Sequence, residues 1–277
     1  MTDDNHLFIK LGDKKAGKGQ LPLYEGKMIH QFDAHFTPAT LVVEEAEVRE
    51  GLLRKEIFRL CQFIRENDVE KVGAKKVPEK REELEALLQT QFAVGEFRLH
   101  YEFERLGARD VGSSTNERTL IATVMPPRVC IGNTINFLRP FRYSVDAKGN
   151  LQQQELDDEE VRSLLCLLDS FVLNYYIRNK VSAHVNIHQL NELPLPKLSA
   201  AQKKKLADAA AKLLKNPRDV KERAALEVFI ARELYGLSLE DWKHLTGTFT
   251  FGSGDSKAEL DEIIRQSVTL WEKRGQP

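Results

Sequence analysis

The chain has few cysteines, no long apolar run and no excess of charge of either sign. Its three cysteines, Cys61, Cys130 and Cys166, are widely spaced and form no Cys-x-x-Cys pair. This spacing argues against a disulfide framework and a cysteine zinc site, and it favours a reducing compartment. No apolar run approaches the roughly 20 residues needed to span a bilayer. The acidic, polar start Met1–Asp4 is unlike a secretory signal. We therefore expect a soluble, cytoplasmic protein with no membrane partner.

The composition is that of an ordinary folded protein. The 277 residues suffice for one large domain or two modest ones, each with a core. Hydrophobic residues make up 42% and charged residues 30% of the chain. The formal net charge of −1 gives no global positive field. A site for a polyanion would therefore have to be a local patch.

Recognisable catalytic motifs are absent from the sequence. No Ser or Cys stands with a His and an acid in a nucleophilic pattern. An amino-methyltransferase would show Asp/Asn-Pro-Pro-aromatic, whose polar groups grip the target amino group. The one Pro-Pro pair lies instead between Met125 and Arg128, which cannot replace those groups. We expect no enzyme activity in this chain.

Two patterns leave alternatives open. Glu25-Gly26-Lys27 matches the Asp/Glu-x-Lys half of a metal-dependent nuclease site, with Asp13 as a possible second carboxylate. Because this tripeptide is common by chance, a nuclease stays an alternative. The Gly-rich stretch 249–255 could be a nucleotide or S-adenosylmethionine loop. It follows no clear buried strand, so we favour a loop between helices.

Two histidines lie four residues apart in a polar stretch. On a helix, His184 and His188 would share a face and could bind a metal. No Cys, Asp or Glu completes a tetrahedral set before Glu192, so a polar loop is the preferred interpretation. His and Asn side chains here also suit contact with a base edge or a phosphate.

Hydrophobic periodicity divides the chain near residue 150. The first part, 1–150, mixes short β-type runs with a helical insertion at about 49–92. The runs are Leu7–Leu11, Met28–Phe32, Phe97–Phe103, Thr119–Met125 and Val129–Phe137. The insertion contains an expected helix Arg49–Asn67, a charged stretch and a second helical pattern Glu82–Phe92.

The second part, 151–277, is predicted to be helical. Helices are expected at Val161–Arg178, after the capping box of Ser199 and Gln202, after Asn216-Pro217, after Ser238, and after Ser256 with Glu259. Prolines 194 and 196 predict an extended connector. The expected class is α+β, with a β-rich half followed by a mostly helical half.

Polar and basic side chains are dense before the helical half. From Asn116 to Gly149 there are five Lys or Arg residues and two acids. Arg can contact guanine or phosphate with two bonds, and Asn can do the same with adenine. The same residue types are also common in turns and on exposed strand faces. The residues alone leave both interpretations open.

Several blocks, in order, carry a family resemblance. They are Leu23–Asp33, Gly107–Val111, Thr115–Ala122, Pro126, Gly132-Asn133, Asp169–Arg178 with Lys180-Val181, Asn186 before Leu193-Pro194, and Leu234–Leu237. Together they resemble the region after the catalytic domain in type IIG restriction–modification proteins and in phage-exclusion (BREX-like) adenine-specific DNA methyltransferases. The match spans roughly Leu21 to Leu237. His35 departs from it, because an Arg is expected there.

The resemblance implies a target-recognition region. Double-stranded DNA would be one partner, and a methyltransferase or nuclease domain, in cis or as a separate subunit, would be the other. S-adenosylmethionine would bind that catalytic domain, so no cofactor is expected in this chain. The implied DNA contacts are Arg109, Arg118, Asn133, Asn136, Arg139, Arg178, Lys180, His184 and Asn186.

Alternatives to this assignment remain. Arg118 could instead be internal, paired with Asp110 or Glu117, and organise the recognition loop. The helical half, with its lysines at 203–205, would support the reader or face phosphates. A protein-docking module that never touches bases is a further alternative to DNA recognition.

Overall fold

The strands of the described residues form three small sheets, and all of these strands except the last lie in the first half of the chain. The four-stranded sheet has the order β1 (Ile9–Lys10), β3 (Leu41–Glu44), β2 (Gln20–Tyr24) and β6 (Cys130–Ile131). The three-stranded sheet has the order β5 (Ala122–Met125), β4 (Arg105–Arg109) and β7 (Ile135–Phe137). A hairpin pairs β8 (Phe141–Val145) with β9 (Leu151–Glu155). All pairings are antiparallel except that of β2 with β6.

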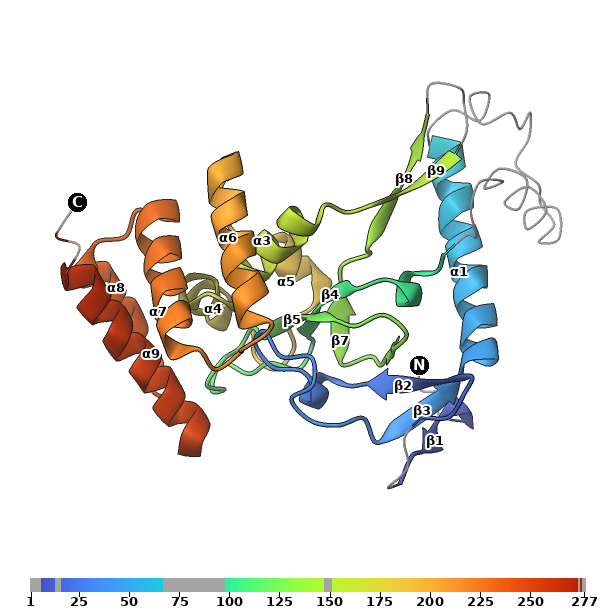
Figure 1. Ribbon diagram of the computed structural model, residues 1–277, viewed down its shortest axis with the longest axis horizontal. Helices are drawn as coiled ribbons and strands as arrows, with labels where there is room; N and C mark the ends of the chain where they lie inside the picture. The colour runs from blue at the N-terminus through green and yellow to red at the C-terminus, as the bar shows by residue number, and fades with distance from the viewer. Residues whose placement is uncertain (1–5, 13–15, 67–97, 147–150, 274, 276–277) are drawn as a thin grey trace.

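The computed structural model describes residues 6–12, 16–66, 98–146, 151–273 and 275. Helix α1 and strands β1–β3, β8 and β9 lie towards one end of an elongated molecule, β4, β5 and β7 lie in its middle, and the C-terminal helices lie at the other end (Figure 1). The predicted α+β class, β-rich first and helical later, is confirmed. Asp13, the charged stretch of the insertion and its second predicted helix Glu82–Phe92 lie outside the described residues.

The predicted helical insertion begins at the end of β3. Helix α1 spans Glu45–Glu66, so its start precedes the expected Arg49. Glu56, 1% exposed, accepts a hydrogen bond from the Tyr143 hydroxyl at 2.8 Å and lies 3.4 Å from Arg139. These contacts attach the helix to strand β8.

Two predicted strands are wrong, and a third is divided into two. Met28 ends a 3₁₀ turn, η2 (Gly26–Met28), and the residues that follow it are irregular up to Phe32, which has a φ of 59°. That left-handed conformation is incompatible with a strand. Phe97–Phe103 contains the 3₁₀ turn η4 (His100–Glu102). Val129–Phe137 divides into β6 and β7, which belong to different sheets.

The helices of the second half follow their predicted caps in most places. They are α3 (Asp158–Asp169), α4 (Phe171–Arg178), α5 (Ile187–Asn191), α6 (Ala200–Leu213), α7 (Val220–Val228), the π-helical η5 (Phe229–Leu234), α8 (Leu239–Gly247) and α9 (Gly254–Lys273). The predicted capping box of Ser199 and Gln202 and the predicted helix start at Ser238 are confirmed, and Ser238 forms a capping box with Asp241. Helix α7 is capped by Asp219 rather than opened at Asn216, and α9 begins before Ser256.

The single helix predicted at Val161–Arg178 is two helices. Ser170 is extended, with a ψ of 151°, and its hydroxyl oxygen accepts a hydrogen bond from the Leu173 amide at 3.2 Å. It is therefore the N-cap of α4, and the chain turns between α3 and α4.

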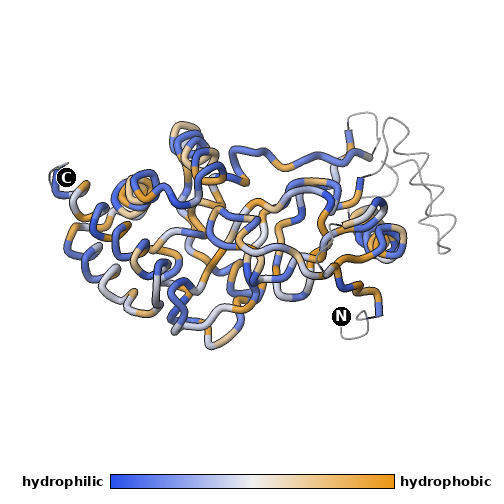
Figure 2. Tube along the Cα trace, turned by 60° about the horizontal axis from the view of Figure 1, so that its bottom comes forward, coloured by the Kyte–Doolittle hydropathy of each residue, from blue (hydrophilic) through white to orange (hydrophobic). Residues whose placement is uncertain are grey.

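The two halves share one hydrophobic core. Leu106 and Ala122 of the three-stranded sheet pack in one cluster with Leu165 of α3, Leu173 of α4 and Ile230 of η5. A second cluster, among the last helices, contains Trp242 and Trp271. Hydrophobic and hydrophilic residues alternate along the helices (Figure 2), as expected for helices with one buried face. None of the helices in the described ranges is long and apolar enough to cross a membrane.

Side chains of α3 and α4 occupy one edge of the segment that leads into β5. The Asn174 Oδ1 atom accepts from the Leu120 amide at 2.9 Å, and the Asp169 Oδ1 atom accepts from the Ala122 amide at 2.8 Å. Both helix residues are at most 2% exposed. The helices thus provide the acceptors that a neighbouring strand would otherwise provide.

Candidate nucleic-acid interface

Five of the nine predicted DNA contacts are occupied with other parts of the chain. Arg118 is 3% exposed and lies over the Phe171 ring, with its Cζ atom 3.5 Å from the ring centroid. Its ion pair is with Glu227, 3.9 Å away, instead of the expected Asp110 or Glu117. Burial lowers the pKa of Arg118 to about 10. The internal alternative for Arg118 fits this position, because its side chain is buried and does not reach the outer surface of the molecule.

Arg178 holds the segment before Arg118. The side chain is 9% exposed, and its Nη2 atom donates to the carbonyl oxygens of Asn116 and Glu117, both at 2.8 Å. Its guanidinium also lies 4.1 Å from the centroid of the Phe249 ring. Arg178 therefore fixes the course of the backbone rather than reaching outward.

Arg109, Asn136 and Arg139 also point to protein groups. Arg109 Nε donates to the Ile29 carbonyl oxygen at 2.9 Å. Asn136 donates to the Val185 carbonyl oxygen at 2.8 Å. The half-buried Arg139 lies 4.8 Å from the centroids of the two aromatic rings of β8 in addition to its ion pair with α1. Arg109 and Arg139 connect elements of the first half, and Asn136 connects the first half to the loop at Val185 in the second.

The other four predicted contacts, Asn133, Lys180, His184 and Asn186, are exposed. Lys180 pairs with Glu192 at 3.2 Å. The Asn186 Oδ1 atom accepts a hydrogen bond from the Gln189 backbone amide at 3.1 Å and caps α5. The side-chain Nδ2 atom of Asn186 takes no part in that bond.

His184 is held in one orientation by Asp110. Its Nδ1 atom lies 2.8 Å from the Asp110 carboxylate, and its side chain is 64% exposed. Because an ionised carboxylate only accepts hydrogen bonds, Nδ1 carries a proton and Nε2 remains for an outside partner. His184 precedes α5 whereas His188 lies within it, so the two do not share a helical face as a metal pair would require.

Backbone hydrogen bonds gather four distant loops into one surface. The Gly26 amide donates to Thr134 Oγ1 at 2.8 Å, and the Asp110 amide donates to the Thr134 carbonyl oxygen at 2.9 Å. The Val185 amide in turn donates to the Asp110 carbonyl oxygen at 2.6 Å. We call this the loop surface, and it consists of residues 25–27, 110–116, 132–134 and 182–188. Lys27, which is not among the nine predicted DNA contacts, belongs to it, and its side chain is 65% exposed.

The nuclease alternative gains nothing from this arrangement. Lys27 pairs with Glu25 at 2.9 Å. Among the residues that the structure describes, no group of three or more His, Cys, Asp or Glu side chains could hold a metal ion.

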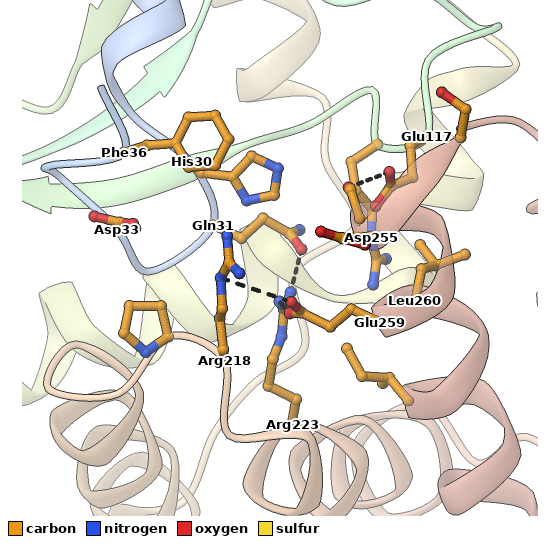
Figure 3. Close-up of a pocket in the computed structure, with 15 residues that line it drawn as sticks. His30, Gln31, Asp33, Phe36, Glu117, Arg218, Arg223, Asp255, Glu259 and Leu260 are labelled. Carbon is orange, nitrogen blue, oxygen red and sulfur yellow. Dashed lines mark hydrogen bonds and ion pairs between the residues drawn. The ribbon is translucent and has the colours of Figure 1, made fainter. Parts of the chain in front are cut away.

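A cavity of about 310 Å³ lies beside the buried Arg118, where the loop after η2 meets the starts of α7 and α9 (Figure 3). We call it the Arg118 pocket. Its ionisable lining residues, apart from His30, are Arg118, Arg218, Arg223, Asp33, Glu117, Asp255 and Glu259. Arg223 donates to Gln31 and lies 3.2 Å from Glu259, and Arg218 lies 3.9 Å from the same carboxylate.

The aromatic part of the pocket is formed by His30 and Phe36. Their ring centroids are 4.8 Å apart, and Phe36 is 44% exposed. Burial, together with the nearby guanidinium groups, lowers the pKa of His30 to about 3, so this imidazole is neutral at physiological pH. The sequence contained no spacing that would have selected either ring.

As predicted, the Gly-rich stretch 249–255 connects two helices. It follows α8 and runs into the first turn of α9. Gly252 has a φ of 111°, and a Cβ atom there would lie 3.1–3.2 Å from Glu117 side-chain atoms. Glycine is therefore required both by the backbone and by the close approach of Glu117. The loop forms one wall of the Arg118 pocket.

A second hollow, of about 700 Å³, lies between α1, β8 and α3. Arg59, Arg139 and Arg142 line it together with Phe141 and Tyr143. Arg142 is exposed. The hollow combines cationic groups with aromatic faces, which are the two components of sequence-independent nucleic-acid contacts.

No protein-family model, curated protein or solved structure matches this chain.

Proposed function

We propose that this chain recognises a DNA sequence on behalf of a DNA-modifying enzyme of the adenine-methyltransferase restriction or phage-defence type. One observation carries the proposal. Four of the blocks that produce the resemblance, far apart in sequence, contribute to the loop surface and expose polar side chains there. Loops on a rigid scaffold are the usual position of recognition residues, and short polar side chains can read base edges.

The exposed residues divide into two roles. Asn133, Asn186 and His184 would contact base edges, because amide and imidazole groups pair with the donors and acceptors of the grooves. Lys27 and Lys180 would contact phosphates. Both lysines already have a carboxylate partner within 3.2 Å, so a phosphate would compete with that partner.

The predicted contacts that lie inside the protein take a positioning role in this proposal. These residues are Arg109, Arg118, Asn136, Arg139 and Arg178. Arg178 is the clearest case, because its two bonds to backbone carbonyls determine how the segment around Asn116 leaves the core.

The chemistry of modification would belong to another domain. A methyltransferase or nuclease domain, in cis or as a separate cytoplasmic subunit, would bind S-adenosylmethionine and act on the base. This chain would supply the choice of site and would carry no catalytic residue.

The test is selection from a pool of random duplex DNA by the full chain at two salt concentrations, followed by sequencing of the bound fraction. We expect one short motif to be enriched at both concentrations. Asn133→Ala should relax one position of that motif, by about 1–3 kcal/mol of discrimination. Lys27→Ala should weaken binding to all sequences and lower the salt dependence by about one phosphate contact.

Asn216→Ala is the matched control, since Asn216 is an exposed asparagine in the helical half, outside the loop surface. It should leave the motif unchanged. A selection without enrichment, or a motif that survives all loop-surface substitutions, would refute the proposal. Absence of any DNA binding would favour the docking alternative.

A further inference from the structure

We propose that the Arg118 pocket binds one nucleobase, with a preference for guanine, that leaves the stack of the bound duplex. The part of this inference that takes the base from a bound duplex rests on the proposed function. The binding of a base by the pocket can be tested separately.

The first argument is an unused hydrogen-bond donor. Arg118 Nη1 and Nη2 are buried and have no hydrogen-bond partner within the described part of the chain, and the Glu227 carboxylate is 3.9 Å away. A buried guanidinium without acceptors is costly. A carbonyl oxygen that enters the pocket beside Arg118 would supply an acceptor.

The second argument is the balance of charge. Three guanidinium groups and four carboxylates line the pocket. A free anion would be repelled by the carboxylates, and a metal cation would be repelled by the guanidinium groups. A neutral ligand with both donors and acceptors fits this lining better than an ion of either sign.

The third argument concerns shape. The cavity of about 310 Å³ is at the lower end of the range of small-molecule sites, about 300–1,000 Å³. Phe36 is exposed at its edge and packs against the neutral ring of His30. A flat heterocycle can stack on such an aromatic face, and a base–aromatic stack is a common unit of nucleic-acid binding.

The polar groups favour guanine among the bases. Its O6 and N7 atoms accept from arginine in the commonest base-specific contact. Its Watson–Crick edge carries two adjacent N–H groups that a carboxylate can accept together. Asp255 is exposed, lines the pocket and makes no hydrogen bond or ion pair with the residues that the structure describes, so its carboxylate can accept.

The pocket is continuous with the loop surface along the chain. The segment 113–116 belongs to the loop surface, and the next two residues, Glu117 and Arg118, form part of the pocket wall. A duplex on the loop surface would therefore lie next to the segment that leads into the pocket. Extrusion of a base costs a few kcal/mol of stacking and pairing, which contacts in the pocket would offset.

The first experiment is calorimetric titration of the full chain with the neutral nucleosides deoxyguanosine, deoxyadenosine, deoxycytidine and thymidine. We expect deoxyguanosine to bind most tightly. Asp255→Asn should weaken its binding by about tenfold or more, because a charged hydrogen-bond acceptor is lost.

Asp261→Asn is the matched control on the same helix, since Asp261 pairs with Lys257 and does not line the pocket. It should leave binding unchanged. Phe36→Ala should also weaken binding, because the stacking face is lost. Equal binding of all four nucleosides would overturn the guanine preference, and no binding of any would overturn the pocket assignment.

The second experiment places a fluorescent guanine analogue at each guanine of the selected duplex. We expect the protein to increase the fluorescence at one position, and Asp255→Asn to abolish the increase. If free deoxyguanosine binds but no duplex position responds, the extruded-base part is overturned and the pocket is a site for a free nucleoside. If neither responds while loop-surface variants still change the selected motif, the inference fails and the proposed function stands.

Discussion

Replacement of Asn174 by alanine tests how the helical half supports the segment that leads into β5. Asn174 is fully buried in α4. Its Oδ1 atom accepts from the Leu120 amide at 2.9 Å, and its Nδ2 atom donates to the Ser170 carbonyl oxygen at 3.0 Å. Alanine removes both bonds and leaves the Leu120 N–H group buried without an acceptor.

The expected loss of stability follows from these contacts. An unsatisfied buried donor costs about 1–3 kcal/mol. The lost amide donor and a small cavity add to this cost, so we expect unfolding to become easier by about 3 kcal/mol in total. At on the order of 2–4 °C per kcal/mol in a chain of this size, the melting temperature should fall by about 6–12 °C.

The assay is urea unfolding combined with amide hydrogen exchange. Exchange of the Leu120 amide should become faster in Asn174→Ala. The control is Asn179→Ala at the end of the same helix, where the exposed side chain donates only to the Tyr175 carbonyl oxygen. The control should change stability by less than about 0.5 kcal/mol. A loss below about 1 kcal/mol in Asn174→Ala, or unchanged exchange of Leu120, would refute the reasoning.

Two further predictions concern pH and backbone packing. Burial raises the pKa of Asp169 to about 8 and that of Glu227 to about 7, so the folded state keeps protons that the unfolded state loses near pH 4, and this contribution to stability falls as pH rises from about 4 to 8. Burial lowers the pKa values of His30 and His100 to about 3, so their contribution falls as pH drops from about 6.5 to 3. The two effects oppose each other between about pH 4.5 and 6.5, so the net loss of stability should lie between about pH 6.5 and 8. Urea midpoints from pH 5 to 8.5 check this, and a midpoint that rises above pH 6.5 would contradict it. Gly112→Ala should destabilise the loop surface, because its Cβ atom would overlap a backbone carbonyl oxygen. Thermal unfolding and motif selection measure that effect, and an unchanged variant would show that the loop can move aside.

Local signals in the sequence predicted local structure. The capping box of Ser199 and Gln202 depends on residues three positions apart, and it starts the helix that it predicts, as Ser238 does for α8. Strands of two to five residues carry much less signal. Strand β9, with the sequence Leu-Gln-Gln-Gln-Glu, lies in the half expected to be helical and has only one apolar residue.

The candidate site depended on contacts that sequence spacing does not encode. Arg118 was a plausible DNA contact because arginine is rarely buried without a partner. Its position is determined by Phe171 and Glu227, which are far along the chain. His184 was selected for its chemistry, but the carboxylate that orients it, Asp110, lies on a different loop.

The acceptors that α3 and α4 present to the β5 segment have a consequence for engineering. A fragment that ends at residue 150 would lack Asp169 and Asn174, and would leave the amides of Leu120 and Ala122 without their acceptors. Such an open strand edge, next to an uncovered apolar face, invites pairing with other copies. Any graft meant to transplant recognition into a related protein should therefore carry the first two helices of the second half with the strands, and change only the loops.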